Sequence, residues 1–191
     1  MKIKNLVNHC KREGVVHMYM DEDGFQWLGD GCSMYPLFDM PLFTETSFCA
    51  AFDIDKHKRD QMSIQFFQSC PAHLDTRDVC DDEQEVFAAK SLAIEVNRQR
   101  YIPYATKLGV RFLSDAYLRP LLDVKNGLQM YERYTTEGNM YFAAKSGLEL
   151  KAIILPSQIV TEDLVDQLSV LAQQCKTALS NMQGGDWNDG I

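Results

Sequence analysis

The sequence has no long hydrophobic run and a shortage of positive charge, and both narrow the possible functions. Its longest apolar stretches, such as 152–155, are far too short to cross a bilayer. Residues 1–14 are too polar for a secretory signal peptide. We therefore expect a cytoplasmic protein without membrane partners. The formal net charge of -8 also opposes unaided binding to nucleic acid, because that affinity depends on lysine and arginine neutralising phosphates.

Recognisable catalytic motifs are missing as well. The chain has no G-x-S-x-G nucleophile turn, and no Walker lysine follows the Gly-Asp-Gly segment at 29–31, which is typical of a tight turn. Cys70, His73 and Cys80 offer three zinc ligands, but a structural zinc site needs four at closer paired spacing. We expect no catalytic residues, no metal and no cofactor, and the sequence favours a protein that is not an enzyme.

The cysteines never occur as a CxxC pair, which argues against both a disulfide framework and a zinc ribbon. We expect free thiols. The six residues are Cys10, Cys32, Cys49, Cys70, Cys80 and Cys175.

The segments that are present indicate an α+β fold. β-Prone stretches separated by turn sequences predict antiparallel sheets, most clearly a meander through 128–134, 140–144 and 148–155. Further extended segments are predicted at 15–20, 25–28, 32–37, 62–68, 92–96, 101–105 and 110–113.

Apolar spacing and capping residues predict four helices. Ile3, Leu6, Val7 and Cys10 recur at helical spacing before Gly14. Thr44 is an N-cap for a helix to about residue 54, and Ser114 caps a short helix over 115–122 that Pro120 should shorten or kink. A long amphipathic helix begins at Thr161 and ends before Gly184, and its apolar residues are Leu164, Leu168, Leu171, Cys175, Leu179 and Met182.

The apolar stripe of this last helix predicts an interface. Leu164, Leu168 and Leu171 cannot remain in water, so we expect them to pack on the sheet or on a second copy of the chain. A protein partner or self-association is therefore expected.

An acidic segment divides the pattern in two. Residues 75–85 contain six acidic residues against Arg77 alone, without apolar periodicity, which is typical of a mobile linker. We predict a first α+β unit at 1–74, an acidic linker at 75–85, a second unit with the long helix at 86–182, and a disordered tail at 183–191. The two units repeat one order, in which the Thr44 helix corresponds to the Ser114 helix, with Phe48 and Phe52 in the roles of Leu118 and Leu121.

Two groups of residues are candidates for binding. Basic side chains could gather on one face to contact nucleic acid, although scattered surface charge is the alternative; they are Lys2, Lys4, Lys11, Arg12 and Arg119. Aromatic residues between Trp27 and Phe52, with Asp30, Asp39 or Asp53, could instead line a small-molecule pocket, although core packing is the alternative.

Residues 112–156 resemble the end of a DNA sliding-clamp domain. The resemblance consists of Phe112 to Leu118, the strands at 128–134 and 140–147, and the closing Ala-Ile-Ile-Leu-Pro at 152–156. It implies a short strand, a helix opening on Tyr-Leu and three antiparallel strands, repeated within the domain. Pro120, the long final helix and a length of about one clamp domain depart from that pattern. In its general style the chain also resembles small proteins of bacterial prophages and mobile elements.

Two hypotheses follow. The first is a non-catalytic binding or accessory protein, a clamp-like factor in phage or mobile-element DNA replication. The second is a small-molecule hydrolase or ligand-binding enzyme with a pocket near Trp27 to Phe52.

Overall fold

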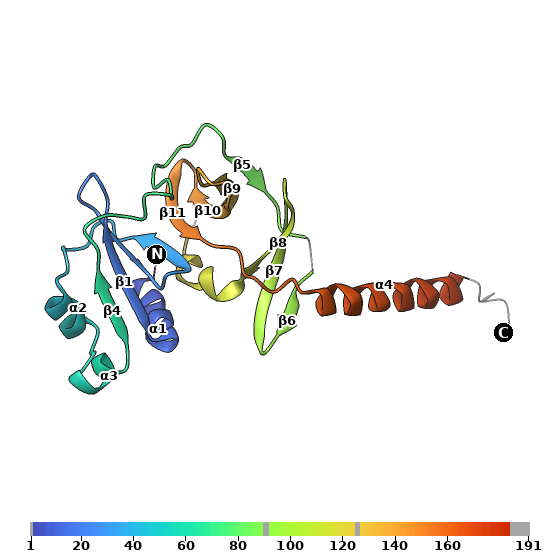
Figure 1. Ribbon diagram of the computed structural model, residues 1–191, viewed down its shortest axis with the longest axis horizontal. Helices are drawn as coiled ribbons and strands as arrows, with labels where there is room; N and C mark the ends of the chain where they lie inside the picture. Colours follow the sequence, from blue (N-terminus) through green and yellow to red (C-terminus); the bar gives the residue numbers. More distant parts are fainter. Residues whose placement is uncertain (1, 90–91, 125–126, 184–191) are drawn as a thin grey trace, which may run out of the picture. The chain divides into compact units, whose positions relative to one another are not determined.

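The computed structural model describes residues 2–89, 92–124 and 127–183. Its helices and strands follow the order shown in Figure 1. The helices are α1 (Ile3–Glu13), α2 (Glu45–Ala51), α3 (Lys56–Asp60), the 3-10 helices η1 (Asp115–Tyr117) and η2 (Arg119–Leu121), and α4 (Glu162–Gln183). The strands are β1 (Val15–Met20), β2 (Gln26–Gly29), β3 (Ser33–Pro36), β4 (Ser63–Phe66), β5 (Gln84–Val86), β6 (Ile94–Val96), β7 (Gln99–Thr106), β8 (Gly109–Ser114), β9 (Gln129–Tyr134), β10 (Met140–Ser146) and β11 (Glu149–Ile154).

An eight-stranded sheet forms the centre of the fold, in the order β4-β1-β2-β3-β11-β10-β9-β5. Its pairs are antiparallel except β1 with β4, which run parallel. A second sheet consists of three antiparallel strands, β6-β7-β8, and its strand β7 forms an isolated bridge through Tyr104 with Ala88, which follows β5. The α+β class and the antiparallel meander β9-β10-β11 are confirmed.

The central sheet contains two units with the same order of elements. In the first, α1 leads into β1, β2 and β3; in the second, η1 and η2 lead into β9, β10 and β11. The last strands of the two units pair at the middle of the sheet, where Met34 lies opposite Ile153 and Ser33 opposite Ile154. From the centre outward, each half of the sheet contains the third, second and first strand of its unit, and β4 and β5 form the two edges.

The helices of both units cover the same face of this sheet. Leu6 of α1 and Leu121 of η2 belong to one hydrophobic cluster, together with Val16 of β1 and Phe142 of β10. A smaller cluster, which includes Trp27 and Tyr141, lies on the opposite face. Such two-layer packing lets a sheet bury one face under helices.

Two predictions about the units are wrong. Contacts divide the chain into residues 1–157 and 158–191, so no boundary lies near the acidic segment 75–85. The reason is the β3–β11 pairing, which joins both predicted halves into one sheet. The helix that corresponds to the Ser114 helix is α1, not the Thr44 helix α2, because only α1 leads directly into three consecutive strands of the sheet.

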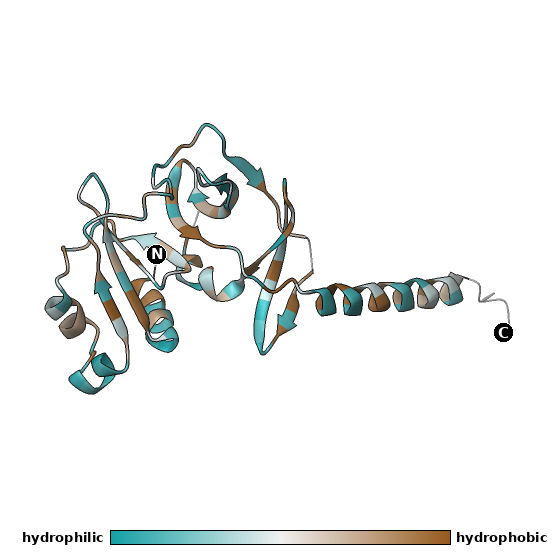
Figure 2. Cartoon of the chain, in the orientation of Figure 1, coloured by the Kyte–Doolittle hydropathy of each residue, from teal (hydrophilic) through white to brown (hydrophobic). Residues whose placement is uncertain are grey.

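The second compact unit is residues 158–191, and its described part contains α4. Thr161 caps the helix, since its hydroxyl accepts from the Leu164 amide at 3.2 Å. Figure 2 shows apolar and polar residues alternating along α4. The predicted tail falls, apart from Gln183, outside the described residues.

Candidate nucleic-acid interface

Helix α1 buries one side and exposes a basic one. Leu6, Val7 and Cys10 are buried against the sheet, as the spacing predicted. Gly14 ends the helix at φ 71° and donates its amide hydrogen to the Cys10 carbonyl, a left-handed position that suits glycine. The last turn contains the basic residues Lys11 and Arg12, whose positive charge interacts favourably with the negative end of the helix dipole.

The exposed side of α1 carries a row of polar side chains. Lys4, Asn8 and Arg12 are all exposed and follow one another at steps of four residues. Residues four apart lie one above the other on a helix, so these three form a single stripe along α1. The residues Lys2–Glu13 include four basic side chains and one acidic one, which contrasts with the acidic chain as a whole.

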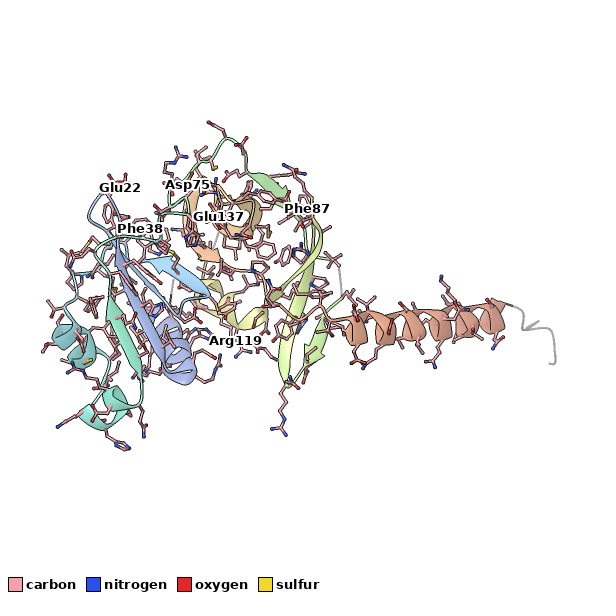
Figure 3. The ribbon with its side chains drawn as sticks, in the orientation of Figure 1. Glu22, Phe38, Asp75, Phe87, Arg119 and Glu137 are labelled. Carbon is pink, nitrogen blue, oxygen red and sulfur yellow. The ribbon has the colours of Figure 1, made fainter. Side chains whose placement is uncertain are left out.

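The second unit brings Arg119 to the start of this stripe. The Lys2 amide donates a hydrogen bond to the Pro120 carbonyl at 2.9 Å, which fixes η2 beside the first turn of α1. Arg119 is 56% exposed and lies 3.5 Å from Asp115. Figure 3 shows its side chain at the surface near α1. The structure therefore gathers Lys2, Lys4 and Arg119 from the two units.

The remaining two basic candidates have internal partners. Lys11 is half-buried and donates to the Phe52 carbonyl, so it ties α1 to the end of α2. Arg12 contacts Glu13 at 3.0 Å and His9 Nδ1 at 2.8 Å. Among the described residues, Lys2 and Lys4 have no carboxylate within ion-pair distance. These two lysines and Arg119 are the side chains best placed to meet an anion. We call Lys2, Lys4, Arg12 and Arg119 the basic face.

A buried polar pair holds α1 in this position. His9 Nε2 lies 2.9 Å from Asp30 Oδ2, and both side chains are almost fully buried. Asp30 Oδ1 also accepts from the Ser33 amide and hydroxyl and from the Cys32 amide. Burial alone would raise the pKa of Asp30, but these hydrogen bonds outweigh it and lower that pKa below 3.8. Asp30 thus joins α1 to the β2–β3 turn as a carboxylate.

The Gly-Asp-Gly segment is the tight turn that its sequence predicted. A Cβ at Gly29 would lie 1.9 Å from the Ser33 carbonyl oxygen, and Gly31 adopts φ 88°. Only glycine fits the first position, and the left-handed backbone of the second favours glycine. The turn presents Asp30 to His9, so the segment positions a structural carboxylate.

The acidic segment 75–85 is not the mobile linker that the sequence predicted. Arg133 of β9, which is fully buried, donates to the carbonyls of Asp75, Arg77 and Asp78 and to the Glu83 carboxylate. These contacts fix the segment against the face of the sheet opposite α1.

Two further contacts support the same segment. Lys145 of β10 donates to the second oxygen of Glu83 at 2.5 Å, and its ammonium lies 4.8 Å from the centre of the Tyr131 ring. The Asp78 carboxylate accepts from the Leu150 amide at 2.7 Å. Several acidic residues of this segment therefore accept hydrogen bonds from β9, β10 and β11. Sequence reasoning missed the cluster because its partners lie 50 or more residues apart.

The aromatic residues between Trp27 and Phe52 do not line one pocket. Trp27 packs in the cluster on one face of the sheet, whereas Phe43, Phe48 and Phe52 pack on the other. Trp27 is also buried, and its indole nitrogen donates to Asp21 at 2.9 Å. The core interpretation of these residues therefore holds.

The acids proposed for that pocket have structural positions as well. Asp39 and Asp53 are exposed and adopt left-handed backbone conformations, at φ 63° and 52°. Aspartate is one of the few residues that tolerates this conformation in turns. Asp30 is engaged by His9 and Ser33. The three carboxylates do not form an acid–base pair.

No group of three histidine, cysteine or acidic side chains within residues 2–89, 92–124 and 127–183 is arranged to hold a metal ion. The six cysteines are unpaired. No described helix combines the length and apolar character that crossing a membrane requires.

Comparisons with protein-family models, with curated proteins and with solved structures found no match for this chain.

Proposed function

We propose that this protein is a non-catalytic accessory factor that binds duplex DNA through its basic face, in the manner of a sliding-clamp domain. The observation that carries the proposal is the placement of α1 and η2. The two elements open the two repeated units, cover the same face of one sheet and contact each other through Lys2 and Pro120.

The topology supports the clamp-like part of this proposal. A helix followed by three antiparallel strands occurs twice, and the two copies meet through their third strands. A sliding clamp needs a smooth sheet on one side and helices towards the DNA. In this chain both helical elements share one side, so a single surface would face the duplex.

The distribution of charge supports the DNA-binding part. Phosphate contacts come from lysine and arginine and do not require base-specific readout. The basic face supplies Lys2, Lys4, Arg12 and Arg119, while the carboxylates of Asp78 and Glu83 are engaged on the opposite face of the sheet. A negative net charge then weakens binding elsewhere on the molecule, which restricts DNA to this surface.

A triple substitution tests the proposal. Replacing Lys2, Lys4 and Arg119 with alanine should weaken duplex binding and reduce the slope of log K against log salt, by about 0.9 for each lost phosphate contact. Fluorescence anisotropy with a labelled duplex at several salt concentrations measures both. None of the three side chains is buried, so the variant should keep its fold.

A matched triple variant separates this surface from charge in general. Lys56, Arg98 and Arg100 are exposed on α3 and on the β6–β7 hairpin, and their replacement by alanine removes the same charge. We expect this control to bind almost as the unaltered protein does. Equal losses in both variants, or no binding of the unaltered protein at low salt, would overturn the proposal.

A further inference from the structure

Helix α4 carries a stripe of apolar side chains along its length. Leu168 is 38% exposed, Leu171 is 55% exposed and Leu179 is 57% exposed. The helix has 22 residues and is therefore about 33 Å long. An isolated helix is marginally stable in water, and an apolar face of this length normally marks an interface.

The stripe has the spacing of a coiled coil over three heptads. Core positions recur at alternating steps of four and three residues and are occupied by Leu164, Leu168, Leu171, Cys175, Ala178 and Met182. The positions that flank this seam carry no charge; they are Val165, Gln167, Ala172, Gln174, Leu179 and Asn181. Flanking charges usually select a different partner or exclude a copy. Nothing along this seam excludes a second copy of the same helix.

Side-chain sizes favour an antiparallel pair. Antiparallel pairing about position 173 places Leu168 opposite Ala178 and Leu171 opposite Cys175 of the other helix, so a large residue meets a small one in these layers, while Leu164 meets Met182 at the ends. A parallel pair would place Ala178 opposite itself and Cys175 opposite itself. Those layers would leave gaps in the second half of the seam, which cost stability.

The charges favour the same direction. Glu162, Asp163 and Asp166 lie in the first turns of α4, and Lys176 is the helix's only basic residue. A parallel pair would bring six carboxylates to one end, whereas an antiparallel pair separates the two acidic groups by most of the helix length. That separation exceeds the screening length of about 8 Å at physiological salt, so their repulsion disappears.

We propose that α4 pairs antiparallel with α4 of a second copy of this chain, forming a two-helix coiled coil that makes the protein a dimer. This interface does not depend on the basic face or on DNA. Each dimer then presents two copies of whatever surface the residues 1–157 use.

Molar mass and stability test the pairing. The unaltered protein should have twice the chain mass of 21.8 kDa by sedimentation equilibrium. The variant Leu168→Asp/Leu171→Asp should have the mass of one chain and retain the denaturant midpoint of the 1–157 fold. The control Val170→Asp/Thr177→Asp adds the same charge outside the seam and should remain dimeric.

Cysteine cross-linking tests the direction. In a Cys32→Ser background, Leu171→Cys should give an oxidised dimer, because its thiol faces Cys175 of the other helix, whereas the background alone should give little. Efficient cross-linking of the background through Cys175 would show a parallel pair and overturn the proposal. A monomeric unaltered protein, a double-aspartate variant that stays dimeric, or one whose 1–157 fold unfolds would also overturn it.

Discussion

The first helix-and-three-strand unit begins with eleven residues of regular α-helix, whereas the second begins with two single-turn 3-10 helices. Pro120 contributes to the difference, since it has no amide hydrogen and disfavours a continuous helix at this point. The three strands that follow are nevertheless paired in the same order in both units. The sheet therefore tolerates a large change in the helix that covers it.

The units also differ in how their outer elements are fixed. In the first unit, one carboxylate, Asp30, joins the helix to a turn on the helical side of the sheet. In the second, the arginine Arg133 holds a whole segment against the opposite side. A short local link suffices for a helix with an apolar face, while a segment without apolar periodicity needs many polar contacts.

The largest expected loss of stability comes from removing Arg133, which holds residues 75–83 against the second unit. Arg133→Ala would leave the Glu83 carboxylate without one of its two cations and three backbone carbonyls without a donor. Removing one partner of a buried ion pair typically costs about 3–5 kcal/mol. Urea unfolding should show this loss. The exposed Arg77 on the same segment is the control, and a similar loss for Arg77→Ala would contradict this role of Arg133.

Weakening the hydrogen bonds of Asp30, which join α1 to the β2–β3 turn of the first unit, should cost less stability. Asp30→Asn keeps the shape but weakens the bonds from His9, Cys32 and Ser33, which predicts a loss of about 1–3 kcal/mol. Thermal or urea unfolding at neutral pH measures it. A loss of stability larger than that of Arg133→Ala would contradict our prediction that Arg133 contributes more than Asp30.

Asp30→Asn should also change how the free energy of unfolding depends on pH. Because folding lowers the pKa of Asp30 below 3.8, its contribution to stability is present above that pH and is lost as the pH falls through the folded pKa. The unfolding free energy of Asp30→Asn should therefore fall less steeply below pH 4 than that of the unaltered protein. Asp39→Asn, at an exposed turn, serves as the control, and an equal change of slope in that variant would contradict this role of Asp30.

The smallest effect is expected from making the two helical elements more alike. Pro120→Ala removes the proline but leaves its carbonyl to accept from Lys2. The loss of proline increases the freedom of the unfolded chain and should lower stability by about 0.4–1 kcal/mol. Circular dichroism would show whether η1 and η2 then join. A stabilised variant with more helix would mean that proline alone keeps the two units different.

Local pattern was sufficient to predict many of the elements. The spacing of Leu6, Val7 and Cys10, the cap at Thr44 and the meander at 128–155 each involve residues close in sequence. Helix α3 was missed because it has no buried residues, although Asp55 caps it. The parallel pairing of β1 with β4 was also missed, since their residues lie about 50 positions apart.

The candidate site was predictable only in part. The sequence indicated the five basic residues, but not that Lys11 donates to Phe52 or that Arg12 contacts buried His9. The His9–Asp30 pair joins residues 21 positions apart and has no motif. The role of Arg133 depends on a fold in which residues 75–83 return to β9. Such contacts are a consequence of topology and leave no periodic signal.

The short β3–β11 pairing at the middle of the sheet has a consequence for synthesis. Ser33 and Met34 leave the ribosome about 120 residues before their partners Ile153 and Ile154. Until then β3 is an unpaired strand edge, which is open to pairing with other chains. At about 5–20 residues per second this interval lasts about 6–24 seconds. Ribosome-bound chains that end before residue 153 should therefore engage chaperones or aggregate, and release from both should follow the emergence of β11.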